Sequence, residues 1–196
     1  MNSSAFLVLH FQNGVAHPNG VWGQKLHPQV QKNNSIENTR IALQRARSRG
    51  MQIIYVNIAY RRNAPELPTK TCGLYKDAKL LNACEIGSWG AAVIDELAPI
   101  EGDIEVINYT SDGFEGTELD LILRTKKIDR LYFSGQCVEH VVATTFKRAV
   151  NMGYECVLLT DCTSGFTDLN YDAMMNILPL YGELVTTEQF LMSSYS

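Results

Sequence analysis

The sequence predicts an α/β protein of three layers, in which helices cover both faces of a central, mostly parallel sheet of six strands. Apolar strand-like runs alternate with segments of helical period along the whole chain. Most of these runs are apolar at consecutive positions, as expected for strands that helices cover on both sides. No repeat, low-complexity tract or linker divides the 196 residues, so we expect one domain over 1–196.

Six short apolar runs are predicted as strands. They are residues 5–9, 53–56, 104–107, 131–133, 156–159 and 183–185. Parallel sheets bind ligands at the carboxyl ends of their strands, near the point where strand order reverses, so the residues just past each run are candidates for a site. Those residues are His10-Phe11-Gln12-Asn13, Asn57, Asn108-Tyr109, Gly135-Gln136-Cys137 and Asp161-Cys162.

The clearest helix is predicted over 138–152, where apolar residues recur at helical spacing along one face. Gly153 is expected to end this helix. A second helix is expected from Ser35, as its N-cap, to Gly50, and a third over 118–126. Each of the three leads directly into a predicted strand.

Residues 60–86 form a long segment between two predicted strands. They have no clear period, they contain Pro65 and Pro68, and they are long for a connection between elements. We expect them to form either a lid or a contact between subunits.

Charge and hydropathy argue against nucleic acid and membrane as partners. The chain has 17 Lys and Arg against 21 Asp and Glu, so it lacks the basic surface that neutralises phosphates. No apolar run reaches the roughly 20 residues of a membrane-spanning helix. The first residues lack the positive region of a secretory signal, and we expect a cytoplasmic protein.

The cysteines and histidines predict neither disulfides nor a metal site. The 5 cysteines are odd in number and form no CxxC pair, which is typical of reduced thiols. None of the 4 histidines is spaced at i, i+4 from another. We expect no metal and no cofactor.

Four ordered segments resemble the motifs of a known family. They are residues 5–13, 87–99, 111–119 and 135–161. Residues 5–13 are similar to a strand ending in Asp-x-Gln-Asn, and residues 87–99 to Gly-x-x-Gly-Ala…Pro-Glu-Leu. Residues 111–119 are similar to Ser-Ala-Phe-x-x-Thr-x-Leu. Residues 135–161 are similar to a strand followed by Gly, a Cys-bearing helix, Gly-Tyr, a second strand and Asp. The chain therefore resembles the isochorismatase-like hydrolase superfamily, which holds nicotinamidases, isochorismatases and carbamoyl-amide hydrolases. This resemblance implies a Rossmann-like three-layer fold.

The resemblance also implies three catalytic residues: an Asp base after the first strand, a Lys after the third, and a Cys nucleophile on the helix after the fourth. This chain departs from all three. His10 stands at the Asp position and Asn108 at the Lys position. The family spacing, counted forward from Gly135 and back from Gly153, places Val141 at the Cys position. Loss of one group is compatible with a changed mechanism, but loss of all three is not.

Cys137 falls four residues before the nucleophile position, in a turn where the resemblance implies a cis peptide bond after Gln136. Two interpretations of Cys137 stay open: a relocated nucleophile, activated by the N-terminus of a helix, or a small residue that fills a tight turn. His10 is either a general base or a pocket histidine bonded to the backbone. His140 is expected to be solvated.

These residues predict a pseudoenzyme, which either binds a small molecule or serves as a non-catalytic subunit. The alternative is an unconventional hydrolase of a small amide, ester or vinyl ether that uses Cys137 and His10. The resemblance also implies a homo-oligomer, either a dimer or a tetramer. The predicted ligand-binding residues are His10, Gln12, Trp22, Asn108, Phe114, Gln136, Cys137 and Val141.

Overall fold

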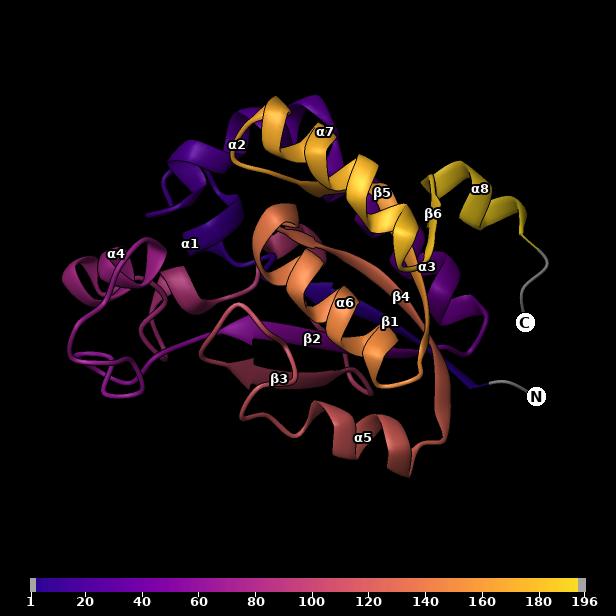
Figure 1. Ribbon diagram of the computed structural model, residues 1–196, viewed down its shortest axis with the longest axis horizontal. Helices are drawn as coiled ribbons and strands as arrows, with labels where there is room; N and C mark the ends of the chain where they lie inside the picture. Colours follow the sequence, from indigo (N-terminus) through magenta and orange to yellow (C-terminus); the bar gives the residue numbers. More distant parts are fainter. Residues whose placement is uncertain (1–2, 194–196) are drawn as a thin grey trace.

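The computed structural model describes residues 3–193, which form one six-stranded sheet between two layers of helices (Figure 1). The strands are β1 (Ser3–Leu9), β2 (Gln52–Ile58), β3 (Ile104–Asn108), β4 (Ile128–Gln136), β5 (Glu155–Ser164) and β6 (Glu183–Val185). The α-helices are α1 (Asn13–Ala16), α2 (Gly23–Lys32), α3 (Ser35–Ser48), α4 (Leu74–Leu81), α5 (Leu119–Thr125), α6 (Ala143–Asn151), α7 (Asp168–Ile177) and α8 (Thr187–Met192). The short helical turns are η1 (Trp89–Ala91), η2 (Asp95–Leu97), η3 (Val138–Val142) and η4 (Leu178–Leu180).

The strand order is β3-β2-β1-β4-β5-β6, and every paired neighbour runs parallel. The chain first builds outward from β1 through β2 to β3, and it then returns to place β4 on the other side of β1. The order of strands therefore reverses between β1 and β4. In an open parallel sheet the crevice outside the carboxyl ends of two such strands is the expected ligand site.

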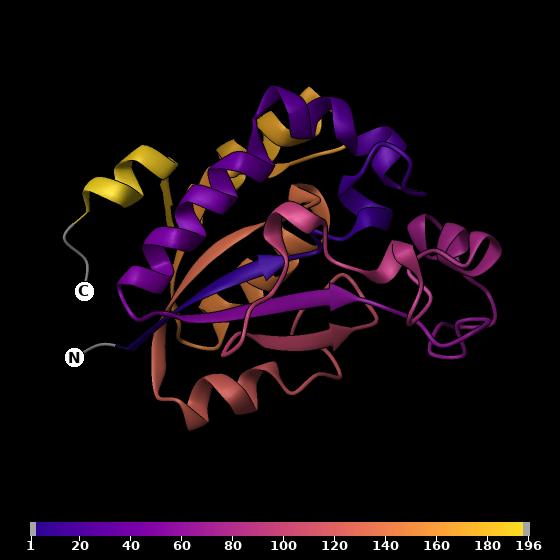
Figure 2. The same cartoon turned by 180° about the vertical axis from the view of Figure 1, so that it is seen from behind.

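Alternating side chains of the central strands enter two different cores. Leu7 of β1 packs with residues of α5 and α6 on one face, whereas Phe6 and Val8 pack with α3 and α8 on the other. Figure 2 shows α3 lying across this second face. The strand interiors are apolar at successive positions because both faces are covered, which confirms the predicted three-layer α/β/α fold.

A third apolar cluster lies beyond the carboxyl ends of the strands. It is built from α1, α2, α4 and the residues that follow β2. Val15, Trp22 and Tyr60 belong to it, and Cys137 contacts it from the turn after β4. These elements cover the crevice between β1 and β4 at the carboxyl ends of the two strands.

Several predicted boundaries are wrong. Asn57, Gln136 and Asp161, expected just past strands, lie inside β2, β4 and β5. Ser35 is the first residue of α3 and not its cap, which is Asn34, and the Ser35 hydroxyl is bonded to Ser164 Oγ at 2.9 Å. The predicted helix 138–152 is divided into the π-helical turn η3 and the α-helix α6.

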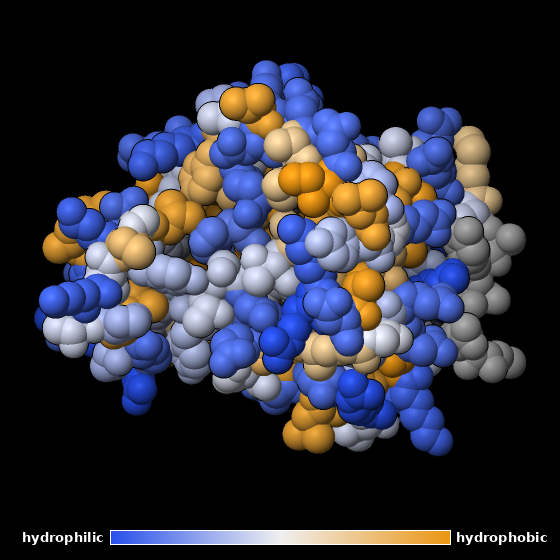
Figure 3. All heavy atoms as spheres, in the orientation of Figure 1, coloured by the Kyte–Doolittle hydropathy of each residue, from blue (hydrophilic) through white to orange (hydrophobic). Residues whose placement is uncertain are grey.

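The surface carries scattered apolar side chains. Figure 3 shows them in several small groups among hydrophilic ones. Among residues 3–193, no helix combines the length and the apolar character needed to span a membrane.

Candidate functional site

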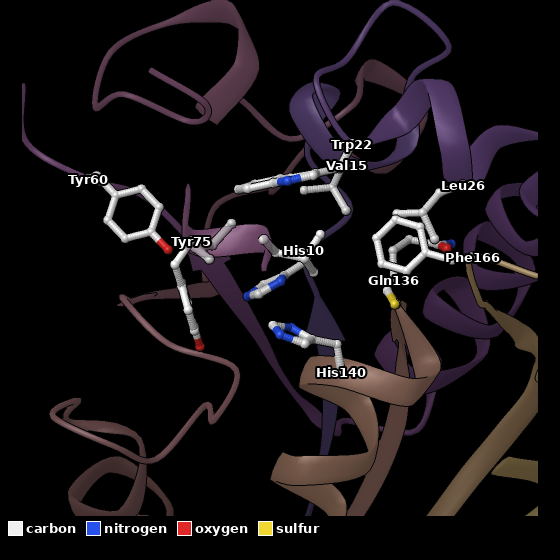
Figure 4. A pocket seen from close by; sticks show the side chains of 12 residues that line it. His10, Val15, Trp22, Leu26, Tyr60, Tyr75, Gln136, His140 and Phe166 are labelled. Carbon is white, nitrogen blue, oxygen red and sulfur yellow. The ribbon is translucent and has the colours of Figure 1, made fainter. Parts of the chain in front are cut away.

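A cavity lies at the carboxyl ends of β1 and β4 (Figure 4). The space inside it, with the open solvent at its mouth included, is about 360 Å³. The described residues that line it are His10, Val15, Trp22, Leu26, Ile58, Tyr60, Leu74, Tyr75, Gln136, Cys137, His140 and Phe166. None of these lining residues is an Asp, Glu, Lys or Arg.

Aromatic rings form much of the wall. They are Trp22, Tyr60, Tyr75 and Phe166. In Figure 4 the His10 imidazole lies between the Trp22 indole and the His140 imidazole. The rings of Tyr75 and His140 have their centroids 6.0 Å apart. Aromatic side chains commonly line small-molecule sites, where they pack against the rings of ligands.

His10 directly follows β1, and its side chain enters the cavity from there. Its φ of 53° turns the chain away from the strand, and its backbone N–H donates to Val56 O at 3.0 Å. The imidazole Nε2 lies 2.9 Å from Asn108 Oδ1, a contact between the ends of β1 and β3. Asn108 is fully buried, and its Nδ2 donates to Thr110 O at 2.7 Å. Asn108 thus lies behind His10 and fixes its ring.

Burial is the main influence on the charge of His10. It lowers the pKa of His10 to about 4, and the field of His140 acts in the same direction, whereas the hydrogen bond to Asn108 Oδ1 opposes both. Burial also lowers the pKa of His140. Both imidazoles are therefore neutral at pH 7.

Cys137 is held in a tight turn after β4. The peptide bond between Gln136 and Cys137 is cis, as the resemblance implied. The Cys137 Sγ donates to Glu139 Oε2 at 2.8 Å. Burial first, and the Glu139 carboxylate second, raise the pKa of the Cys137 thiol well above its usual value. This is the opposite of the environment that activates a thiol nucleophile.

Glu139 also connects the turn to the first turn of α7 and to the segment before it. Its Oε1 accepts hydrogen bonds from Phe166 N at 2.8 Å and from Asn170 Nδ2 at 2.9 Å. The carboxylate therefore has three donors within the protein. It positions Phe166 against the cavity.

Two buried polar atoms of the wall have no hydrogen-bond partner among the described residues. They are Nε1 of Trp22 and Oε1 of Gln136. Gln136 is otherwise held through Nε2, which donates to Ser35 Oγ at 2.9 Å. Unpartnered buried atoms are rare in folded proteins, and beside a cavity they are consistent with a ligand or a water.

Not all of the predicted ligand-binding residues line this cavity. Gln12 is fully buried and its amide bonds the backbone of Ile58 and Ala91. Val141 is fully buried in the core formed with α6, and Phe114 stacks on Tyr154 with centroids 6.2 Å apart. Their side chains are already used in packing or in backbone pairing.

The prediction for His140 was wrong. It was expected to be solvated because it lies off the apolar stripe of the helix, yet it is half-buried in the cavity wall. The first turn of that helix is π-helical, so the side-chain directions there differ from those of a regular α-helix. In addition, Tyr75 covers the ring from α4.

Sequence reasoning missed other wall residues. They are Val15, Leu26, Ile58, Tyr60, Leu74, Tyr75 and Phe166. Tyr60 and Phe166 follow β2 and β5 by two residues, so their place near the strand ends is the signal in the sequence that points to them. The others come from α1, α2, β2 and α4 and carry no local signal.

Within residues 3–193 no group of three or more His, Cys, Asp or Glu side chains is arranged to hold a metal ion. The cavity can instead offer hydrogen bonds from neutral groups and apolar contact.

Comparisons with known proteins agree with this architecture. The isochorismatase domain family matches residues 4–189. An uncharacterized isochorismatase family protein of Bacillus subtilis, YwoC, is 26% identical over 189 residues, which cover 96% of this chain and 92% of that protein. The ureidoacrylate amidohydrolase RutB of Caulobacter segnis is 28% identical and covers 96% of this chain and 84% of its own length. The crystal structure of an isochorismatase family protein from Desulfovibrio vulgaris has the same fold, with a TM-score of 0.85, 21% identity and 96% of each chain covered.

Proposed function

The chain belongs to the isochorismatase family, and we propose that it is a pseudoenzyme that binds a small molecule in the cavity beside His10 without hydrolysing it. The main support for this proposal is the hydrogen bond of 2.9 Å between His10 and Asn108. By the resemblance, these residues occupy the positions of a catalytic Asp and Lys. The charged pair is thus replaced by the imidazole of His10, whose pKa is about 4, and by the amide of Asn108, which cannot titrate.

The nucleophile position supports the same proposal. Val141, which the family spacing places there, offers only a buried hydrocarbon side chain. The thiol of Cys137 lines the cavity but is bonded to Glu139, and its pKa is raised. These contacts weigh against the alternative, in which Cys137 and His10 form an unconventional hydrolase of an amide, ester or vinyl ether.

The direct test is an assay of ammonia release from ureidoacrylate and from nicotinamide by the purified chain. The Caulobacter segnis RutB enzyme, assayed in parallel on ureidoacrylate, is the positive control. We expect no release above the rate in buffer alone. Turnover at roughly one per second or faster, within the ordinary range for enzymes, would contradict the proposal.

A second role, as a non-catalytic subunit of a homo-oligomer, is favoured by exposed apolar side chains. Leu169 of α7 and Leu180 of η4 are 78% and 81% exposed. Contiguous exposed apolar patches often contact another chain, and these two side chains would contribute to one if a partner covers α7 and η4. Light scattering of the purified protein tests this role: a dimer or tetramer is expected, and a strict monomer would rule out self-assembly.

A further inference from the structure

The hydrogen bonds of Asn108 determine which nitrogen of His10 carries the proton. Asn108 Nδ2 donates to Thr110 O at 2.7 Å and lies 3.5 Å from Asp112 O. Both partners are carbonyl oxygens, which only accept, so the amide nitrogen must point toward them. Asn108 Oδ1 then faces His10 Nε2 and must accept from it. His10 Nε2 therefore carries its proton.

The other ring nitrogen, His10 Nδ1, is consequently a bare acceptor whenever the ring is neutral. It has no hydrogen-bond partner among the described residues. A ligand that meets Nδ1 must therefore bring a hydrogen atom, as an N–H or O–H group does. A carboxylate brings only lone pairs and would be repelled.

The rest of the wall offers a charged ligand no partner of opposite charge. No lining residue of the described chain is an Asp, Glu, Lys or Arg. The nearby carboxylate of Glu139 is engaged by Cys137, Phe166 and Asn170. An ion that entered would lose its hydration without gaining a partner of opposite charge, which is costly.

The wall also contains a donor that lacks a partner. Trp22 Nε1 is buried and bonds no described residue. Trp22 lies opposite the imidazole of His10 in Figure 4. A ligand with a hydrogen-bond acceptor as well as a donor would satisfy both atoms.

From these contacts we infer that the cavity binds an uncharged, planar ring compound that donates a hydrogen bond to His10 Nδ1, and that it discriminates against the anion of the same ring. The inference rests on the proposed function and adds the chemical class of the ligand. It assigns His10 and Asn108 a role in selecting charge, with Asn108 acting as a positioning residue.

Two matched pairs of probes test this class with the full chain: nicotinamide against nicotinate, and benzamide against benzoate. Each pair keeps the ring and changes the charge. Titration calorimetry at pH 7.5 should give affinities for the amides about tenfold or more above those for the carboxylates. Equal or tighter binding of the carboxylates would overturn the inference. So would the absence of binding by both pairs at millimolar concentration.

Nitrogen-15 NMR of the His10 ring gives a second readout that needs no ligand, with the His10→Asn variant to assign the signals. We expect the neutral form with the proton on Nε2 at pH 7.5, and a change in the Nδ1 signal when nicotinamide is added. A protonated Nδ1 would overturn the inference. Ammonia release from nicotinamide would instead contradict the proposed function, whichever member of each pair binds more tightly.

Discussion

His10 Nε2 and Asn108 Oδ1 lie 2.9 Å apart although the two residues are separated by 98 positions in the sequence. The contact joins the carboxyl end of β1 to that of β3, across the end of β2. It holds a neutral imidazole inside a cavity whose described lining carries no charged side chain. The charge of His10 and the stability of the protein are therefore linked.

Acid should destabilise the protein through His10. Burial lowers its pKa from 6.5 to about 4, so between these values the unfolded chain binds the proton more readily than the folded one. The stabilisation is present above pH 6.5 and is lost as the pH falls toward 4. The loss amounts to about 3 kcal/mol.

Urea unfolding at pH 7 and pH 4 measures this effect. The matched variant is His10→Asn, because asparagine tolerates the positive φ of this position. The wild type should lose about 3 kcal/mol more than the variant between the two pH values. An equal loss in both proteins would show that His10 titrates normally.

Cys137 should react slowly with iodoacetamide at neutral pH. Its thiol is buried and bonded to Glu139, whereas Cys72 is exposed. Labelling followed by peptide mass spectrometry should therefore modify Cys72 well before Cys137. The reverse order would instead support the alternative, an unconventional hydrolase that uses Cys137 and His10.

The variant Glu139→Gln isolates the effect of the carboxylate on Cys137. It removes the negative charge that helps to raise the pKa of Cys137, and Gln can still accept from Phe166 N. Labelling of Cys137 should accelerate several-fold, while that of the buried Cys156 should not change. If both cysteines accelerated together, general loosening of the fold would explain the change instead.

Gly135 should not tolerate a side chain. A Cβ added there would lie 2.7 Å from Leu9 Cβ and 2.8 Å from Val142 Cγ2, where β4 approaches β1 just below the cavity. Gly135→Ala should therefore lower the free energy of unfolding by about 1–3 kcal/mol. The matched control is Gly90→Ala, whose nearest atom would be at an ordinary 3.6 Å. Thermal or urea unfolding of both variants gives the comparison, and equal stabilities would contradict the close packing.

The sheet could be predicted from sequence because its strands are short apolar runs. The same logic found His10, Gln136 and Cys137, since residues at or just past the ends of neighbouring parallel strands meet at one edge of the sheet. Tyr75 was missed because it reaches the cavity from α4, a helix within a segment of no clear period.

Two further errors have a common origin in local geometry. Gln12 lies just past β1, as His10 does, yet its amide is hydrogen-bonded to the backbone of Ile58 and Ala91. His140 was placed on the wrong side because a regular helix was assumed where the turn is π-helical. Spacing along the sequence predicts which part of the fold a residue lies in. Long-range hydrogen bonds and the local type of helix determine which way its side chain points.

Introducing a cation beside His10 should change the ligand preference. In Asn108→Lys an ammonium group would take the place of the amide at the end of β3, and it would offer an anion the partner that the native wall lacks. Nicotinate and benzoate should then bind about tenfold or more tightly than they bind the wild type. The lost hydrogen bonds of Asn108 to His10 and Thr110 should cost about 1–3 kcal/mol of stability.

The control for this change is Asn57→Lys, because Asn57 lies on β2 beside Glu105 and does not line the cavity. It adds the same charge to the protein without placing it near His10, so carboxylate binding should stay as weak as in the wild type. Calorimetry measures both variants once circular dichroism has established that they are folded. A folded Asn108→Lys protein that binds carboxylates no better than the control would show that the charge of the wall does not set the preference.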